Sequence, residues 1–170
     1  RISMLSGQYP TTTRQFSGTG LCDARMPWMP RTFREAGYHT GAFGKFHVNC
    51  VGRAQWGMDV AAASMGEDHD LAQPPGYHYR QYCQDQGVPW PTDQMHCHNP
   101  FGPHQTPPTS ATSDMPWMRQ WSCCSDVPLA HSLETWTTDQ CLHFLNAHAT
   151  SQTEQPFFVW LTYDRPHWPS

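Results

Sequence analysis

The stretch Gly37-Tyr38-His39-Thr40-Gly41-Ala42-Phe43-Gly44-Lys45-Phe46-His47 decides the fold that the sequence predicts. Upstream, residues 29–36 have the pattern of a short helix, and Gly37 can end that helix because glycine takes the left-handed conformation at little cost. Residues 40–43 are then expected to form a short strand, with Gly44 opening a loop. A helix followed by a buried strand is a unit of an α/β sheet.

Lys45 and His47 follow this expected strand, and open α/β sheets bind their ligands at the carboxyl ends of their strands. Lys45 is the only lysine in 170 residues. Its ammonium is a compact charge suited to an anionic oxygen, and a histidine can move a proton near neutral pH. Taken alone, this pattern is equally compatible with a solvated turn.

A second helix and strand are expected near the end of the chain. Ser132 is a candidate N-cap for a helix whose apolar face runs to His148. Residues 157–163 are apolar and aromatic, which predicts a strand buried on both faces. His167 would then leave the carboxyl end of this strand, on the same side of the sheet as Lys45.

Residues 60–128 are rich in Pro, His, Gln and Trp, and we expect them to form a surface insertion. A weak helical pattern runs from 77 to 86. Residues 67–70 (Glu-Asp-His-Asp) and 96–98 (His-Cys-His) could suggest metal ligands, but consecutive acidic residues rarely surround one ion and the second spacing lacks paired zinc ligands. Three tryptophans are more simply explained as anchors of the insertion than as a substrate mouth: Trp90, Trp117 and Trp121.

Composition limits the function further. The net charge of −4 gives no footprint for nucleic acid, and no apolar run approaches a membrane span. Ile, Leu, Val and Phe total only 23 residues, so the eight Trp and eight Met must supply much of the core. The seven cysteines are odd in number and contain no CxxC pair, so neither disulfides nor the redox compartment can be read from them.

The two ends of the chain add two further motifs. The chain opens Arg1-Ile2-Ser3-Met4-Leu5-Ser6-Gly7-Gln8-Tyr9-Pro10, and near its end it reads Pro156-Phe157-Phe158-Val159-Trp160-Leu161-Thr162-Tyr163-Asp164-Arg165-Pro166-His167. With the central stretch, these resemble three successive signatures of the type I sulfatases, which are arylsulfatase-like enzymes of the alkaline phosphatase superfamily. The first signature runs Cys-x-Pro-Ser-Arg, two variable residues, two apolar residues and Thr-Gly.

The matches can be followed residue by residue. Arg1 matches the arginine of the first signature, and Ser6 stands where threonine is usual. The second signature has the form Gly-Tyr-x-Thr-x-x-small-Gly-Lys-x-His, and only Phe43 departs from it. The third is a buried strand followed by Pro166 and His167. The resemblance therefore spans the chain, with a loose middle.

The resemblance implies an α/β, alkaline-phosphatase-like sandwich with a central, mostly parallel sheet flanked by helices. Residues 1–170 would be an internal fragment of one catalytic domain, because the family's formylglycine, made from Cys or Ser, would lie four positions before Arg1. The divalent metal, usually calcium, would be held by residues outside the fragment. We therefore expect the 170 residues alone to be inactive.

The resemblance also implies roles for four residues. Arg1 would brace the formylglycine, and Lys45 would bind its oxygen and the sulfate. His47 would take a proton, and His167 would hold the sulfate or protonate the leaving oxygen. The implied partners are a small-molecule or glycan sulfate ester and the formylglycine-generating enzyme. Family members are often periplasmic, secreted or lysosomal, and the sequence does not choose among these.

Two other functions remain open at this level. A phosphonate monoester or phosphodiester hydrolase of the same superfamily shares these elements, and no residue here separates sulfur from phosphorus. A non-catalytic binding protein that kept the fold would lack the nucleophile or the metal carboxylates.

Overall fold

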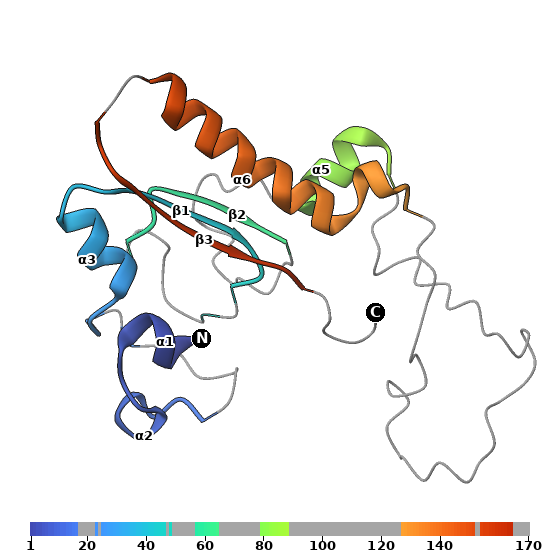
Figure 1. Cartoon of the computed structure of the whole chain (residues 1–170). Coiled ribbons are helices and arrows are strands. Elements are labelled where there is room, and N and C mark those ends of the chain that lie inside the picture. Colours follow the sequence, from blue (N-terminus) through green and yellow to red (C-terminus); the bar gives the residue numbers. More distant parts are fainter. Residues whose placement is uncertain are drawn as a thin grey trace, which may run out of the picture.

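The fold is a mixed α/β arrangement around three parallel strands (Figure 1). The computed structural model describes residues 1–16, 23, 25–46, 48, 57–64, 79–88, 127–151 and 154–164. The strands are β1 (His39–Gly44), β2 (Val60–Ala63) and β3 (Phe157–Thr162), in the order β2-β1-β3. The strand predicted from the central stretch is therefore the middle strand of the three, paired on both sides.

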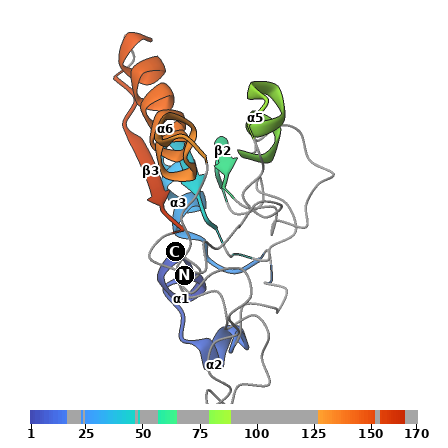
Figure 2. The same cartoon turned by 90° about the vertical axis from the view of Figure 1, so that its right-hand side faces the viewer.

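Helices flank this sheet. The first three are α1 (Ile2–Ser6), α2 (Pro10–Thr13) and α3 (Met29–Glu35). The later ones are α5 (Tyr79–Gln86), the 3₁₀ turn η2 (Leu129–His131) and the long α6 (Leu133–Thr150). In Figure 1, α6 runs above the strands while α1 and α2 lie below them, and the turned view of Figure 2 keeps α1 and α2 at the bottom.

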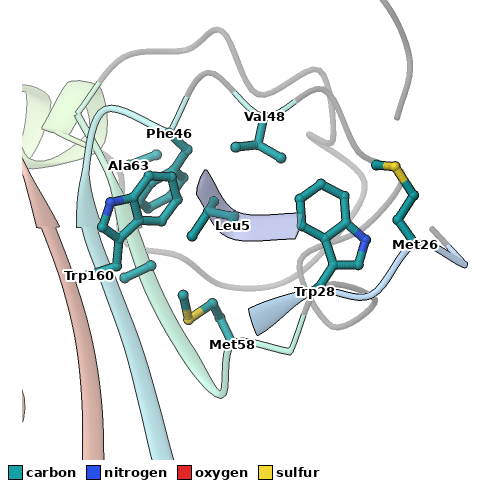
Figure 3. Packing of buried hydrophobic residues seen from close by; sticks show 9 residues of the cluster. Leu5, Met26, Trp28, Phe46, Val48, Met58, Ala63 and Trp160 are labelled. Carbon is teal, nitrogen blue, oxygen red and sulfur yellow. The ribbon is translucent and has the colours of Figure 1, made fainter. Parts of the chain in front are cut away.

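Successive strand residues point to opposite faces of the sheet, so each strand contributes to two cores. On the face of α1 and α3, Ala42, Ala63 and Trp160 join a cluster with Leu5 and Trp28. Figure 3 shows Leu5 in the middle of this cluster. The tryptophans and methionines do supply much of this aliphatic-poor core, as the composition required; full burial of one large apolar side chain contributes about 1.5–3 kcal/mol.

The opposite face is covered by α5 and α6. The strand residues that pack on this face are Phe43, Ala62 and Val159. Each is next in sequence to a residue that faces α1 and α3. The helices contribute two cysteines and several aromatic residues to the same cluster: Tyr79, Cys83, Trp136, Cys141 and Phe144. The sheet is thus enclosed between two helical layers.

The helix before the central strand ends as predicted. α3 stops at Glu35, and Gly37 has φ +89°, the left-handed conformation expected of it. The Tyr38 amide donates to the Phe33 carbonyl at 3.0 Å, closing the last turn. The Phe33 ring then stacks on Phe158 of β3, with ring centroids 4.6 Å apart.

The N-cap of α6 is also confirmed. The Ser132 hydroxyl accepts a hydrogen bond from the Thr135 amide at 3.2 Å. The predicted apolar face buries Trp136, Cys141 and Phe144 against the sheet. No helix in the described part of the chain is both long enough and apolar enough to cross a membrane.

The burial predicted for β3 is wrong. Within the described residues only Trp160 of this strand is buried, whereas Phe157 is 49% and Leu161 36% exposed. β3 stands at the end of the strand order and has a described neighbour on one side only, so its side chains are covered incompletely.

The expected insertion at 60–128 also needs correction at its start. Val60–Ala63 is strand β2, and the structure buries Ala62, Ala63, Tyr79 and Cys83. The strand was missed because three consecutive alanines have little intrinsic preference for β structure, so packing against β1 decides their conformation. Residues 65–78 and 89–126 lie outside the described residues, as do the candidate metal ligands at 67–70 and 96–98 and the three tryptophans.

Candidate active site

Three polar side chains meet where the three parallel strands end. Lys45 follows β1, Ser64 follows β2, and Asp164 lies just beyond β3. The Ser64 amide donates to the Gly44 carbonyl at 3.0 Å, which joins two of these strand ends directly. Because the strands are parallel, their carboxyl ends share one edge of the sheet, where such folds bind ligands.

The ammonium of Lys45 is buried and faces a carboxylate. Its side chain is 6% exposed, and Nζ lies 3.4 Å from Oδ1 of Asp164, which is itself 13% exposed. The other carboxylate oxygen, Oδ2, accepts a hydrogen bond from the hydroxyl of the buried Ser64. A solvated turn would leave the lysine in water, so this burial contradicts the simpler interpretation of Lys45.

The backbone of Lys45 is held by β3. The Thr162 hydroxyl donates to the Lys45 carbonyl at 2.7 Å. The preceding Gly44 has φ +98°, and a Cβ there would lie 1.7 Å from the Thr162 carbonyl oxygen. Only glycine fits this position, which explains physically why glycine precedes the lysine in the motif.

Helix α1 packs next to this edge. Leu5 is fully buried in the cluster that contains Phe46, the residue after Lys45 (Figure 3). Arg1 immediately precedes α1, and its carbonyl accepts the first helical hydrogen bond from the Leu5 amide at 2.9 Å. The Arg1 side chain is exposed and forms no hydrogen bond or ion pair with other described residues. The role predicted for Arg1 stays a prediction.

His47 and His167 lie outside the described residues, and their predicted roles are likewise untested. The residues on either side of His47 are buried: Phe46 is 3% and Val48 4% exposed. Both of these neighbours belong to the cluster that contains Leu5.

The opposite, amino edge of the sheet carries a different polar group. The Thr40 hydroxyl donates to the Gly57 carbonyl at 2.8 Å and accepts from the Asp59 amide at 3.0 Å. Asp59 Oδ2 accepts from the Thr40 amide at 3.0 Å, while Oδ1 pairs with Arg34 Nε at 2.9 Å. The threonine of the motif and the turn at residues 57–59 thus brace the start of the sheet.

The described residues do not fit a metal site. No group of three His, Cys, Asp or Glu side chains gathers among them, and the one described carboxylate at the carboxyl edge, Asp164, is engaged by Lys45 and Ser64. The proposal that the metal ligands belong to other stretches is left as a prediction.

Sequence reasoning missed two residues of this site, Ser64 and Asp164. Asp164 could have been found by the argument applied to Lys45, since both follow a predicted strand at its carboxyl end. Ser64 could not, because it lay in the segment interpreted as an insertion.

The chemistry available at this edge is electrostatic. A fixed cation in a water-poor site stabilises developing negative charge without reorganising during the reaction. Lys45 is such a cation. It lies beside the carboxyl ends of β2 and β3, at the edge of the sheet where α/β folds bind their ligands.

Comparison with known families agrees with this geometry. The family model described as Sulfatase matches residues 1–170, the whole chain. The chain therefore belongs to the sulfatase family, and its parallel sheet between helices is consistent with the alkaline-phosphatase-like fold of that family. This membership makes it part of a sulfatase-type hydrolase. A search of the curated proteins finds no match to it.

Proposed function

We propose that this chain is part of an enzyme that hydrolyses sulfuric esters, with a formylglycine four positions before Arg1 as its nucleophile. The observation that carries the proposal is the buried ammonium of Lys45 at the carboxyl edge of the sheet, in a chain that the sulfatase family model matches throughout. A sulfate ester presents the anionic oxygens that such a cation binds.

The chain's own residues would act as follows. Lys45 would bind a sulfate oxygen and hold the ester against the nucleophile. His47 would accept a proton from the nucleophile's oxygen, and His167 would bind the sulfate or donate a proton to the departing alkoxide. Arg1 would brace the formylglycine. When present, the formylglycine supplies as its hydrate the oxygen that attacks sulfur.

A phosphonate monoester or phosphodiester has similar anionic oxygens, so the substrate class must be measured. The experiment compares kcat/KM of the full-length, metal-loaded enzyme for an aryl sulfate and an aryl phosphonate. We expect the sulfate to be the better substrate. The reverse order would instead assign a phosphonate hydrolase, and turnover of neither would favour a binding protein that kept the fold.

The nucleophile is tested separately. A hydrazide probe reacts with an aldehyde and with no ordinary side chain, so it should label the peptide that ends near Arg1. We expect that label to depend on coexpression with the formylglycine-generating enzyme. An unlabelled but active enzyme would reject the formylglycine.

A further inference from the structure

The carboxyl edge contains a carboxylate in direct contact with the lysine that the proposed function uses. We propose that Asp164 is a positioning residue for Lys45, held in place by Ser64, and that this pair aims the ammonium at the anionic group of the substrate. The inference rests on the proposed function, because it specifies how Lys45 is presented to the substrate.

The ammonium is buried but has hydrogen-bonding capacity to spare. A lysine ammonium has three N–H donors, and none of them makes a hydrogen bond to another described residue. Its distance of 3.4 Å to Asp164 Oδ1 exceeds the 2.7–2.9 Å of a charge-assisted hydrogen bond. Within the described residues, the ammonium is thus paired in charge while its donors make no hydrogen bond that would compete with an anionic ligand.

The two oxygens of Asp164 are used differently. Oδ2 accepts the hydroxyl proton of Ser64, which fixes the orientation of the carboxylate. Oδ1 is buried and has no hydrogen-bond partner among the described residues, so the ammonium is the positive charge it faces there. Because an unpaired buried charge is costly, each of Lys45 and Asp164 makes the burial of the other tolerable.

Each of the three strands contributes one part of this arrangement. β1 delivers the lysine, β2 the serine and β3 the aspartate, and Thr162 of β3 also holds the Lys45 carbonyl. The lysine is therefore fixed at its backbone by Thr162 and at its ammonium by Asp164. One anchor on β3 and a second just beyond its end thus hold the two ends of the long lysine residue.

The proposal makes an unusual kinetic prediction for Asp164→Asn. The change removes the counter-charge that positions Lys45, so kcat should fall by about 10-fold. It also removes a negative charge next to an anionic substrate, so KM should not rise. A residue that only supported the fold would not produce this split between kcat and KM.

A double-mutant cycle isolates the coupling. It compares Asp164→Asn, Lys45→Ala and the double variant in the full-length, metal-loaded enzyme, with whichever of the aryl sulfate and aryl phosphonate the wild type hydrolyses. We expect Asp164→Asn to have less than about a 2-fold effect once Lys45 is gone, because positioning acts only through the ammonium. Equal losses in both backgrounds would overturn the proposal.

Ser64 and a control complete the test. Ser64→Ala should lower kcat less than Asp164→Asn does, and Ser64→Thr should restore it because the hydroxyl is kept. Asp139→Asn, an exposed carboxylate on α6, should leave the kinetics unchanged. If Asp164→Asn does not fold, Ser64→Ala and Ser64→Thr replace it. A double-mutant cycle of Ser64→Ala with Lys45→Ala then tests whether the positioning acts through the ammonium.

Failure of this inference can be told apart from failure of the proposed function. If the wild type is active but the effects of Asp164→Asn and Lys45→Ala on kcat are additive, the positioning role is rejected and the proposed function is not. A wild type that hydrolyses neither ester and binds no inorganic sulfate by calorimetry rejects both.

Discussion

The two edges of the sheet use polar residues in opposite ways. At the amino edge, the Thr40 hydroxyl and both Asp59 oxygens have hydrogen-bonding or ionic partners at 2.8–3.0 Å. At the carboxyl edge, Asp164 Oδ1 has no hydrogen bond to a described residue, and the Lys45 ammonium is 3.4 Å from it. Among the described residues, the polar groups of the amino edge are satisfied, whereas Asp164 Oδ1 and the Lys45 ammonium at the carboxyl edge have no hydrogen bond.

This difference separates stability from function. Buried polar groups are normally hydrogen-bonded, and those that are not are costly to the fold. Natural proteins keep such groups where activity requires them, because a site that binds an anion must hold donors ready for it. The amino edge is therefore expected to control folding and the carboxyl edge to control turnover.

The largest effect is expected at Lys45. Lys45→Ala removes a charge that stabilises the transferred group in the transition state, so kcat should fall by about 10²–10³, the typical loss for one such contact. Lys45→Arg should not restore the rate, since a planar guanidinium cannot replace a compact ammonium in a tight site. Steady-state kinetics of the full-length, metal-loaded enzyme measures both variants.

The matched control for Lys45 is Arg25→Ala. Arg25 is a surface cation whose side chain is 90% exposed and paired with Asp23, and such exposed pairs contribute little to stability. Its loss should leave kcat unchanged. Wild-type turnover in Lys45→Ala would show that the carboxyl edge is not the catalytic one.

At the amino edge, Asp59→Ala should lower stability and not turnover. The change removes the acceptor of Thr40 and the partner of Arg34, with an expected loss of about 1–3 kcal/mol in the free energy of unfolding, reduced by the partial exposure of Asp59. Denaturant unfolding measures this loss, and kcat is compared per folded molecule. A kcat loss comparable to that of Lys45→Ala would remove the distinction between the edges.

A smaller effect is expected at Thr162, which links the sheet to the lysine backbone. Thr162→Val deletes the hydrogen bond to the Lys45 carbonyl while keeping the side-chain shape, at a cost of about 0.5–1.5 kcal/mol. kcat should fall less than in Lys45→Ala. Thr162→Ser keeps the hydroxyl and should retain both properties, so equal losses in the two variants would reject the hydrogen bond as the cause.

The last effect is that of alkaline pH on stability, which is expected to act through the α5–α6 face. Burial raises the pKa of the Cys83 and Cys141 thiols above 9.0, and it raises the pKa of Tyr79 above 10.0. A raised folded pKa contributes stability that is fully present below the unfolded pKa and is lost as the pH rises through the folded one. The melting temperature should therefore begin to fall above about pH 9.

Tyr79→Phe tests this cause. The variant loses the hydrogen bond to the His131 carbonyl, so its melting temperature starts lower, but the fall above pH 10.0 should be shallower than in wild type. Tyr9→Phe, at a side chain that is 80% exposed, serves as the control. Parallel curves for wild type and Tyr79→Phe would show that the buried phenol does not contribute.

Local signals in the sequence predicted most of the elements correctly. Gly37 ends α3, Ser132 caps α6, and the central stretch forms β1, each within one or two residues of the predicted boundary. These features depend on neighbours a few positions apart, through capping bonds and backbone conformation. The same local signals predict Lys45 at the end of a strand.

Weak local signals explain the errors. The alanines of β2 do not prefer a strand on their own, and the two clusters that bury Ala62 and Ala63 form only when β1 and the helices are in place. The aromatic run of β3 predicted full burial, yet Phe157 and Leu161 are exposed because burial depends on what lies beside a strand.

The sequence by itself therefore determined the helix-strand pair of α3 and β1, the later pair of α6 and β3, the left-handed conformation of Gly37, and the lysine at the end of β1. Only the tertiary structure decided that β1 is central and that Ser64, 100 residues before Asp164, joins it beside Lys45. Pairing across such separations is set by parallel strand register and by the packing of both faces, which no local spacing encodes. The carboxylate that positions the lysine is for this reason a property of the fold, whereas the lysine is a property of the motif.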